Sequence, residues 1–190
     1  MHKRAVLALA LLFVAAGCSR EGRVKHGIAT DEGIAAIASP EGQYRDLLKR
    51  SYFSTQSGPV TLGILGLDEG CAVLDSAVDA VVSRNLPKWR ANLIAAYRSN
   101  VSPDQLAEAV QKSPRRARAM LAPQADAIGS SMRQLSLPLL ENSTVEVMGS
   151  TFAAANRIDR VKRDMATRQR DVATISASDE ICGVRKWQRK

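Results

Sequence analysis

The side chains best suited to chemistry in this chain are three cysteines and two histidines: Cys18, Cys71, Cys182, His2 and His26. A thiol can carry a lipid, pair with a second thiol or bind zinc, and an imidazole can act as a base or as a metal ligand. Zinc sites and Ser-His-Asp or Cys-His sites need a histidine among other ligands or inside a folded pocket. Both histidines lie near the start of the chain, so neither kind of site is predicted.

Two pairs of adjacent carboxylates, Asp68-Glu69 and Asp179-Glu180, are the remaining candidates for catalysis. Paired carboxylates can serve as acid and base in glycan cleavage. Acidic residues also favour helix N-termini, where they interact with the helix dipole, and this use is far more common. The chain has no Gly-rich loop followed by Lys-Ser or Lys-Thr. The sequence therefore predicts no catalytic residue, no metal site and no cofactor, with a carboxylate enzyme acting on cell-wall glycan as the alternative.

The first residues have the order of charges and apolar residues that is typical of a signal peptide. His2, Lys3 and Arg4 precede an unbroken apolar run from Ala5 to Ala16. This run is short for a membrane span but has the length of the apolar core of an export signal. Residues 1–17 are therefore predicted to be a leader that is removed during export.

The segment Ala15-Ala16-Gly17-Cys18 resembles the lipobox of bacterial lipoproteins, in which a peptidase cuts before a cysteine that carries diacylglycerol. In that family the third residue before the cysteine is usually Leu, whereas here it is Ala15. The resemblance implies lipidation of Cys18 and stable membrane anchoring. Ser19 stands where Asp would retain a lipoprotein in the inner membrane, which implies the periplasmic face of the outer membrane. An ordinary secretory leader remains the alternative, because Ala-Ala-Gly also suits the standard signal peptidase.

If Cys18 carries lipid, Cys71 and Cys182 remain as a pair. The periplasm is oxidising, so a Cys71–Cys182 disulfide is predicted. It would close a long loop and stabilise the fold by about 4–5 kcal/mol in the chain-entropy model. The alternative is two buried free thiols.

The remainder of the chain is predicted to be one all-α domain, a compact bundle of about five to seven short helices. Residues 18–29 read as a polar tether and residues 30–190 as the domain. The domain is rich in Ala, Leu, Arg and Gln, and only 4% of the full chain is aromatic. Apolar residues recur at steps of three and four along four segments: 71–81, 89–97, 121–135 and 152–165.

Local signals set the expected helix boundaries. Ser39-Pro40 and Ser113-Pro114 each place an N-cap before a proline at the first helical position, and Ser102 to Gln105 forms a capping box. Breaks are expected near four residues, which are Pro87, Asn100, Pro114 and Pro138. The short apolar run Val60 to Leu67 is compatible with a strand or a buried helix.

The C-terminal end is strongly basic. Residues 157–190 hold ten of the basic side chains and five of the acidic ones. Tryptophan among cations resembles an interfacial anchor. The contact candidates for an anionic surface are Trp89, Arg185, Lys186, Trp187, Arg189 and Lys190. The alternative is a solvated helix face with Trp187 packed beside Cys182.

Residues 86–135 resemble a family of bacterial secreted helical proteins classed as a domain of unknown function. Tyr97, the run from Ser102 to Leu106, and Ser113-Pro114 occupy matching places. Gln105 replaces the usual Glu, and Arg116 stands where Gly is expected. The family has no assigned activity, so the resemblance implies a helical fold and no function.

These observations predict a non-enzymatic outer-membrane lipoprotein that acts as a binding or structural module of the bacterial envelope. The expected partners are the membrane, through the N-terminal lipid, and anionic components such as lipopolysaccharide, anionic phospholipid or the cell wall. An envelope location argues against nucleic acid as a physiological partner. An accessory lipoprotein for a protein partner is a further alternative, which would require an exposed apolar patch.

Overall fold

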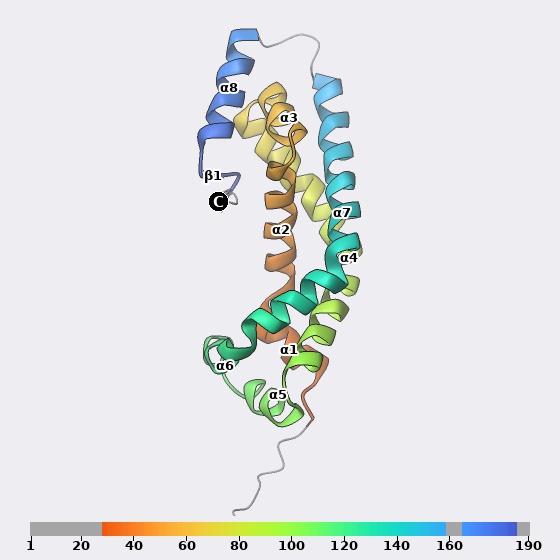
Figure 1. The fold of residues 1–190 in the computed structure, drawn as a ribbon. Helices are drawn as coiled ribbons and strands as arrows, with labels where there is room; N and C mark the ends of the chain where they lie inside the picture. Colours follow the sequence, from red (N-terminus) through yellow and green to blue (C-terminus); the bar gives the residue numbers. More distant parts are fainter. Residues whose placement is uncertain (1–27, 159–164, 186–190) are drawn as a thin grey trace, which may run out of the picture.

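Two 34-residue helices, α4 (Leu67–Asn100) and α7 (Ala125–Ile158), form the frame of the fold in the computed structural model. Each is roughly 50 Å long at 1.5 Å per residue. They make the most extensive contact between any two elements of the described chain, and the molecule is correspondingly elongated (Figure 1).

The structure describes residues 28–158 and 165–185. The other elements in these ranges are α1 (Asp31–Ala38), α2 (Pro40–Ser54), α3 (Ser57–Leu65), α5 (Pro103–Ala109), α6 (Pro114–Met120), the 3₁₀ turn η1 (Ala122–Gln124), α8 (Met165–Ala177), β1 (Glu180–Ile181) and β2 (Val184–Arg185). The prediction of an all-α bundle is confirmed, with the short antiparallel β1–β2 hairpin as the only sheet in the described part of the chain.

The shorter helices cover the frame at its two ends. Helix α2 packs against both α4 and α7, while α1 contacts α6 at the lower end in Figure 1 and α8 contacts α3 at the upper end. Gly63 permits the close approach of α3 and α8, because a methyl group at this position would overlap the Val172 side chain.

The run Val60 to Leu67, for which the sequence allowed a strand or a helix, is largely helical, with a break at Gly66 between α3 and α4.

Two of the four expected helix breaks are wrong. Asn100 ends α4 and Pro114 begins α6, but Pro87 and Pro138 lie inside α4 and α7. A proline inside a helix removes one hydrogen bond and typically bends it, and Figure 1 shows α7 bent in its first half. Both prolines are exposed, so water can hydrate the carbonyl groups they leave without a donor.

A side chain from α4 meets α7 close to Pro138. Asn92 donates hydrogen bonds to the backbone carbonyl of Leu135 at 3.0 Å and to the hydroxyl of Ser136 at 3.1 Å. A bent helix exposes backbone carbonyls next to its proline, and these need donors. Asn92 therefore ties the two long helices together at the place where α7 departs from regular geometry.

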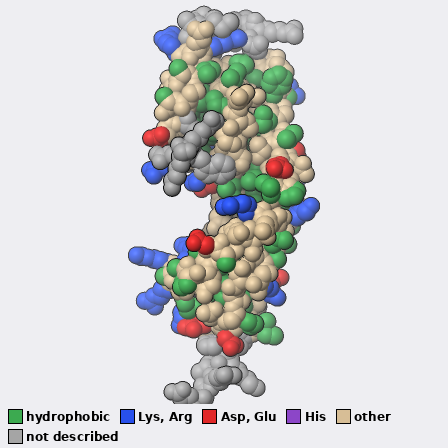
Figure 2. All heavy atoms as spheres, viewed as in Figure 1, with side chains coloured by type: hydrophobic (Ala, Val, Ile, Leu, Met, Phe, Trp, Pro, Cys, Tyr) green, Lys and Arg blue, Asp and Glu red, His purple; other side chains and the backbone are tan. Residues whose placement is uncertain are grey.

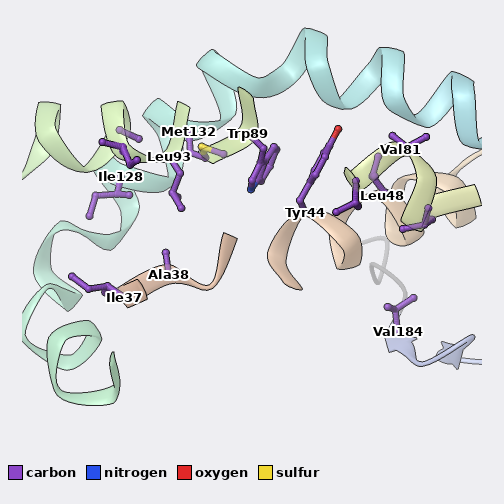
Figure 3. Packing of buried hydrophobic residues seen from close by; sticks show 14 of the residues in the cluster. Ile37, Ala38, Tyr44, Leu48, Val81, Trp89, Leu93, Ile128, Met132 and Val184 are labelled. Carbon is purple, nitrogen blue, oxygen red and sulfur yellow. The ribbon is translucent and has the colours of Figure 1, made fainter. Parts of the chain in front are cut away.

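The centre of the core is a stack of two aromatic rings. The ring centroids of Tyr44 from α2 and Trp89 from α4 lie 4.6 Å apart with an interplanar angle of 14° (Figure 3). The Tyr44 hydroxyl lies 2.6 Å from the Ser143 Oγ of α7, which also accepts a hydrogen bond from Asn85. This group joins α2, α4 and α7, and aliphatic side chains including Leu48 and Leu93 lie on either side of it.

Of the three serines predicted to be N-caps, only Ser102 forms a side-chain hydrogen bond to its helix. The Ser102 hydroxyl accepts a hydrogen bond from the Gln105 backbone N–H at 3.3 Å, so the expected N-cap of α5 is confirmed. The Gln105 side chain meets the Ser102 hydroxyl instead of its backbone N–H. Ser39 and Ser113 precede their prolines as expected, but neither side chain caps its helix. At Ser39 the backbone is left-handed, with φ of 51°, because this residue also ends α1.

All three tyrosines of the chain are buried, and this predicts an alkaline titration. Burial is the main cause that raises the pKa of Tyr44, Tyr52 and Tyr97 above the ordinary value of 10.0. At pH 10 we expect far less tyrosinate absorbance from the folded protein than from the protein in denaturant. Since the raised pKa values belong to the folded state, stability should hold below pH 10 and fall as the pH rises through them. Equal titration curves with and without denaturant would contradict this expectation.

Candidate binding surfaces and the disulfide

An apolar groove lies between α3 and α7, with a volume of about 620 Å³. Hydrophobic side chains gather at this upper end of the molecule in Figure 2. Three side chains of the groove are strongly exposed: Val60 at 48%, Val145 at 68% and Phe152 at 56%. The remaining lining residues are Gln56, Ser57, Thr61, Ile64, Met148 and Gly149.

The spacing of these residues follows from helix geometry. Val60 and Ile64 are four residues apart on α3, and Val145, Met148 and Phe152 recur at steps of three and four on α7. Residues at these steps lie on one face of a helix. The two helices therefore present facing apolar rows, and the groove lies between them.

Two threonine hydroxyl groups beside the groove are engaged within the fold. Thr61 donates to the Ser57 carbonyl at 2.8 Å, and Thr151 donates to the Met148 carbonyl at 3.0 Å. Because these two threonine hydroxyls bond to backbone carbonyls, the groove offers its occupant mainly methyl, methylene and aromatic surface.

The predicted helical spacing of apolar residues over 152–165 includes one residue of this α7 row, Phe152. Ala155, the next residue in that spacing, is buried. Phe152 faces solvent at the groove, because no described element covers this side of α7 beyond α3. Val145 and Met148 extend the same spacing, so periodicity could have identified the row. Periodicity cannot distinguish a row that is covered from one that is open.

The predicted disulfide between Cys71 and Cys182 is present. The sulfur atoms are 2.00 Å apart and the Cα atoms 5.2 Å apart, across a sequence separation of 111 residues. Cys182 and Gly183 form the turn of the β1–β2 hairpin, and both have positive φ, of 48° and 73°. Two successive positive φ values are characteristic of a type I′ turn. Sequence analysis did not predict this hairpin, which the disulfide attaches to the first turns of α4.

A buried lysine reinforces the attachment of the hairpin. Lys49 of α2 is 8% exposed, and its ammonium group donates to the Cys182 carbonyl at 2.9 Å. The same group lies 2.5 Å from the Asp75 carboxylate of α4. A buried ammonium needs such partners, because burial of an unpaired charge is strongly unfavourable. Lys49 therefore links α2, α4 and the hairpin at one point.

The two carboxylate pairs considered for catalysis lie near the disulfide. Asp68 and Glu69 are exposed in the first turn of α4, where acidic side chains suit the helix dipole. Asp179 and Glu180 are exposed at the hairpin, and Glu180 lines an open hollow of about 390 Å³ next to Cys71. In the described part of the chain, no group of three or more His, Cys, Asp or Glu residues could hold a metal ion.

Trp89 is not an anionic-surface contact, and this part of the prediction is wrong. The side chain is 2% exposed and stacked on Tyr44 in the core. The flanking Lys88 and Arg90 point outward while the ring points inward, because residues adjacent on a helix face different directions. Arg185 is exposed in β2, as a contact candidate must be. The other candidates, Lys186, Trp187, Arg189 and Lys190, lie outside the described residues.

The positive charge of the chain is concentrated outside the described ranges. The full chain has 27 basic and 19 acidic side chains. Eleven of the basic and three of the acidic ones lie in residues 1–27, 159–164 and 186–190, which leaves sixteen of each sign in the described body. The body is therefore neutral, and many of its charges are paired, as in the ion pairs of Arg45 with Asp79, Arg84 with Glu146 and Arg98 with Asp31.

No family model, curated protein or solved structure matches this chain. Within the described ranges, no helix combines the length and apolar character needed to cross a membrane.

The disulfide predicts a large loss of stability when it is removed. The double substitution Cys71→Ser/Cys182→Ser should lower the free energy of unfolding by about 4–5 kcal/mol, because it releases a loop of more than one hundred residues in the unfolded chain. Urea denaturation measures this loss, and non-reducing gels of the wild type should show a mobility shift upon reduction. Cys18→Ser is the control that should leave both readouts unchanged. Two titratable thiols at these positions in the unreduced, denatured protein would contradict the bridge.

Proposed function

We propose that this chain is a lipid-anchored protein of the bacterial envelope whose helical body is a non-enzymatic binding module. The single observation that supports a binding role best is the open apolar groove between α3 and α7. Exposed apolar surface of this kind is unfavourable in water and marks interaction sites in soluble proteins.

The occupant that we propose for the groove is an apolar segment of a partner protein. The groove is open along one side and flanked by strongly exposed Val145 and Phe152. Sites for small apolar ligands usually bury most of the ligand surface, and an open groove between helices cannot do so. An amphipathic helix laid between two helices would cover these side chains in the manner of a helix in a groove.

The proposed anchor is Cys18, with residues 19–27 as the connection to the body. The resemblance of Ala15 to Cys18 to a lipobox supports it, as does the chemistry of the remaining cysteines, which form one disulfide. The anchor would place the groove and the disulfide in the oxidising periplasm. Outer-membrane attachment follows from Ser19 by the same resemblance.

A contact between the basic C-terminal end and an anionic envelope component is the second part of the proposal. Arg185 is exposed, and residues 186–190 add three more cations directly after it. The described body has equal numbers of acidic and basic side chains, so the excess positive charge of the chain lies in segments such as this one. Arg185 lies in the hairpin that is fixed to Cys71, whereas the described chain begins next to Arg98. Cys71 and Arg98 are 27 positions apart on α4, or roughly 40 Å of helix. The C-terminal hairpin and the start of the described chain are therefore attached at well-separated points of α4.

The anchor is tested by metabolic labelling with a palmitate analogue. We expect label on the wild-type protein and none on Cys18→Ala, because lipid attachment requires the thiol of Cys18. Cys71→Ser/Cys182→Ser is the control and should keep the label. Absence of label from the wild type would contradict the lipoprotein assignment.

The groove is tested with two matched glycines of α7. Gly149 lines the groove and Gly129 does not, and a side chain at either position meets nothing within 4 Å. Both Gly149→Glu and Gly129→Glu should raise helix stability by about 0.5 kcal/mol, since glutamate is a better helix former than glycine. Only Gly149→Glu places a charge in the apolar groove.

The readout is photo-crosslinking in cells from a photoreactive phenylalanine at Val145, with the adduct identified by mass spectrometry and the complex rebuilt from purified proteins. We expect one discrete protein adduct, which Gly149→Glu abolishes and Gly129→Glu preserves. An adduct that survives Gly149→Glu, or that contains lipid alone, would contradict a protein segment as the occupant.

A further inference from the structure

Two arginines in the described body have no partner and stand together at the start of α6. Arg115 and Arg116 are exposed, and neither makes a hydrogen bond or an ion pair with another described residue. Lys112, just before them, is half-exposed and forms only a loose pair with Glu108, at 3.6 Å. Lys and Arg side chains project over α6 at the left edge of Figure 2. We call Lys112, Arg115 and Arg116 the α6 cationic corner.

The corner lies at the end of the molecule where the described chain begins. Thr30 caps α1, and a methyl group at Gly33, three residues later, would lie 3.0 Å from Val110 at the end of α5. Arg118 of α6 donates to the Ile37 carbonyl at 3.1 Å, which fixes α6 against α1. The corner is therefore attached rigidly to the first helix of the body.

Residues 18–27 connect this end of the body to the proposed anchor. Ten residues from Cys18 to Ile28 span at most about 35 Å when fully extended. The segment itself carries Arg20, Arg23 and Lys25 against one acidic residue, Glu21. If Cys18 is held in a bilayer, lipid headgroups thus lie within reach of this end, and cations are present both in the connection and at the corner.

We propose that the α6 cationic corner docks on the anionic phospholipid headgroups of the bilayer that holds Cys18. The inference rests on the proposed anchor and adds the orientation of the body, with α5 and α6 toward the membrane and the α3–α7 groove away from it. Unpaired guanidinium groups suit this role, because arginine binds phosphate with paired donors and each basic residue near an anionic surface adds to the attraction. Among the other acidic side chains at this end, Asp31 and Glu32 are engaged by Arg98 and Arg90, and Asp104 and Asp126 are exposed in the first turns of α5 and α7.

The test uses the full mature chain with Cys18→Ser, so that binding does not depend on lipid attachment. Its association with vesicles of phosphatidylcholine, with and without phosphatidylglycerol, is measured by flotation at low and high salt. We expect binding only to the vesicles with phosphatidylglycerol, and loss of this binding at high salt. Arg115→Gln/Arg116→Gln should weaken it roughly 10- to 30-fold.

Two control variants make the result specific. Lys88→Gln/Arg157→Gln removes the same charge from exposed positions elsewhere on the body and should have little effect. Lys186→Gln/Arg189→Gln/Lys190→Gln removes the C-terminal cations and should weaken binding less than the corner variant does. Equal losses in the corner and control variants, or a dominant loss in the C-terminal variant, would overturn the inference.

Palmitate labelling separates this inference from the proposed function. Labelled Cys18 together with a corner variant that still binds the anionic vesicles as well as the wild type would overturn the docking and leave the anchor in place. Corner-dependent binding without label would support docking while overturning the anchor.

Discussion

The contact on which the fold depends most is the stack of Tyr44 on Trp89, together with the hydrogen bond between the Tyr44 and Ser143 hydroxyl groups. Through this one buried side chain, that of Tyr44, α2 contacts both α4 and α7. Aromatic rings bury a large apolar area, and the Tyr44 hydroxyl needs a partner when it is removed from water. Ser143 supplies that partner, which fixes the register of α7 against the other two helices.

The two ends of the molecule are organised differently around this centre. At the upper end α3 is held by α8, and the open side of α7 leaves the apolar groove. At the lower end α1, α5 and α6 close the bundle, and Arg115 and Arg116 face solvent. The disulfide and Lys49 add a third fixed point, which holds the C-terminal hairpin to α2 and α4. An apolar surface and a cationic surface are thus carried by separate parts of one rigid frame.

The helix boundaries show how local and tertiary effects compete. Ser102 and Asn100 mark real boundaries, because a cap satisfies backbone groups that only a helix end leaves free. Pro87 and Pro138 are local breakers that did not break their helices. Each removes one hydrogen bond, whereas the packing of α4 against α7 buries apolar side chains on both sides of the proline. The summed burial exceeds the local loss, so the helices continue and α7 bends.

The sequence by itself determined the helical class, the main capping site and a pair of cysteines that could form a bridge. These features depend on propensity, spacing and the number of thiols, all of which are local or compositional. Only the tertiary structure decided that Trp89 is in the core, that Phe152 faces solvent and that a hairpin turn carries Cys182. Helical spacing assigns residues to one face, but burial depends on which distant element covers that face, and this is settled by packing across the whole chain.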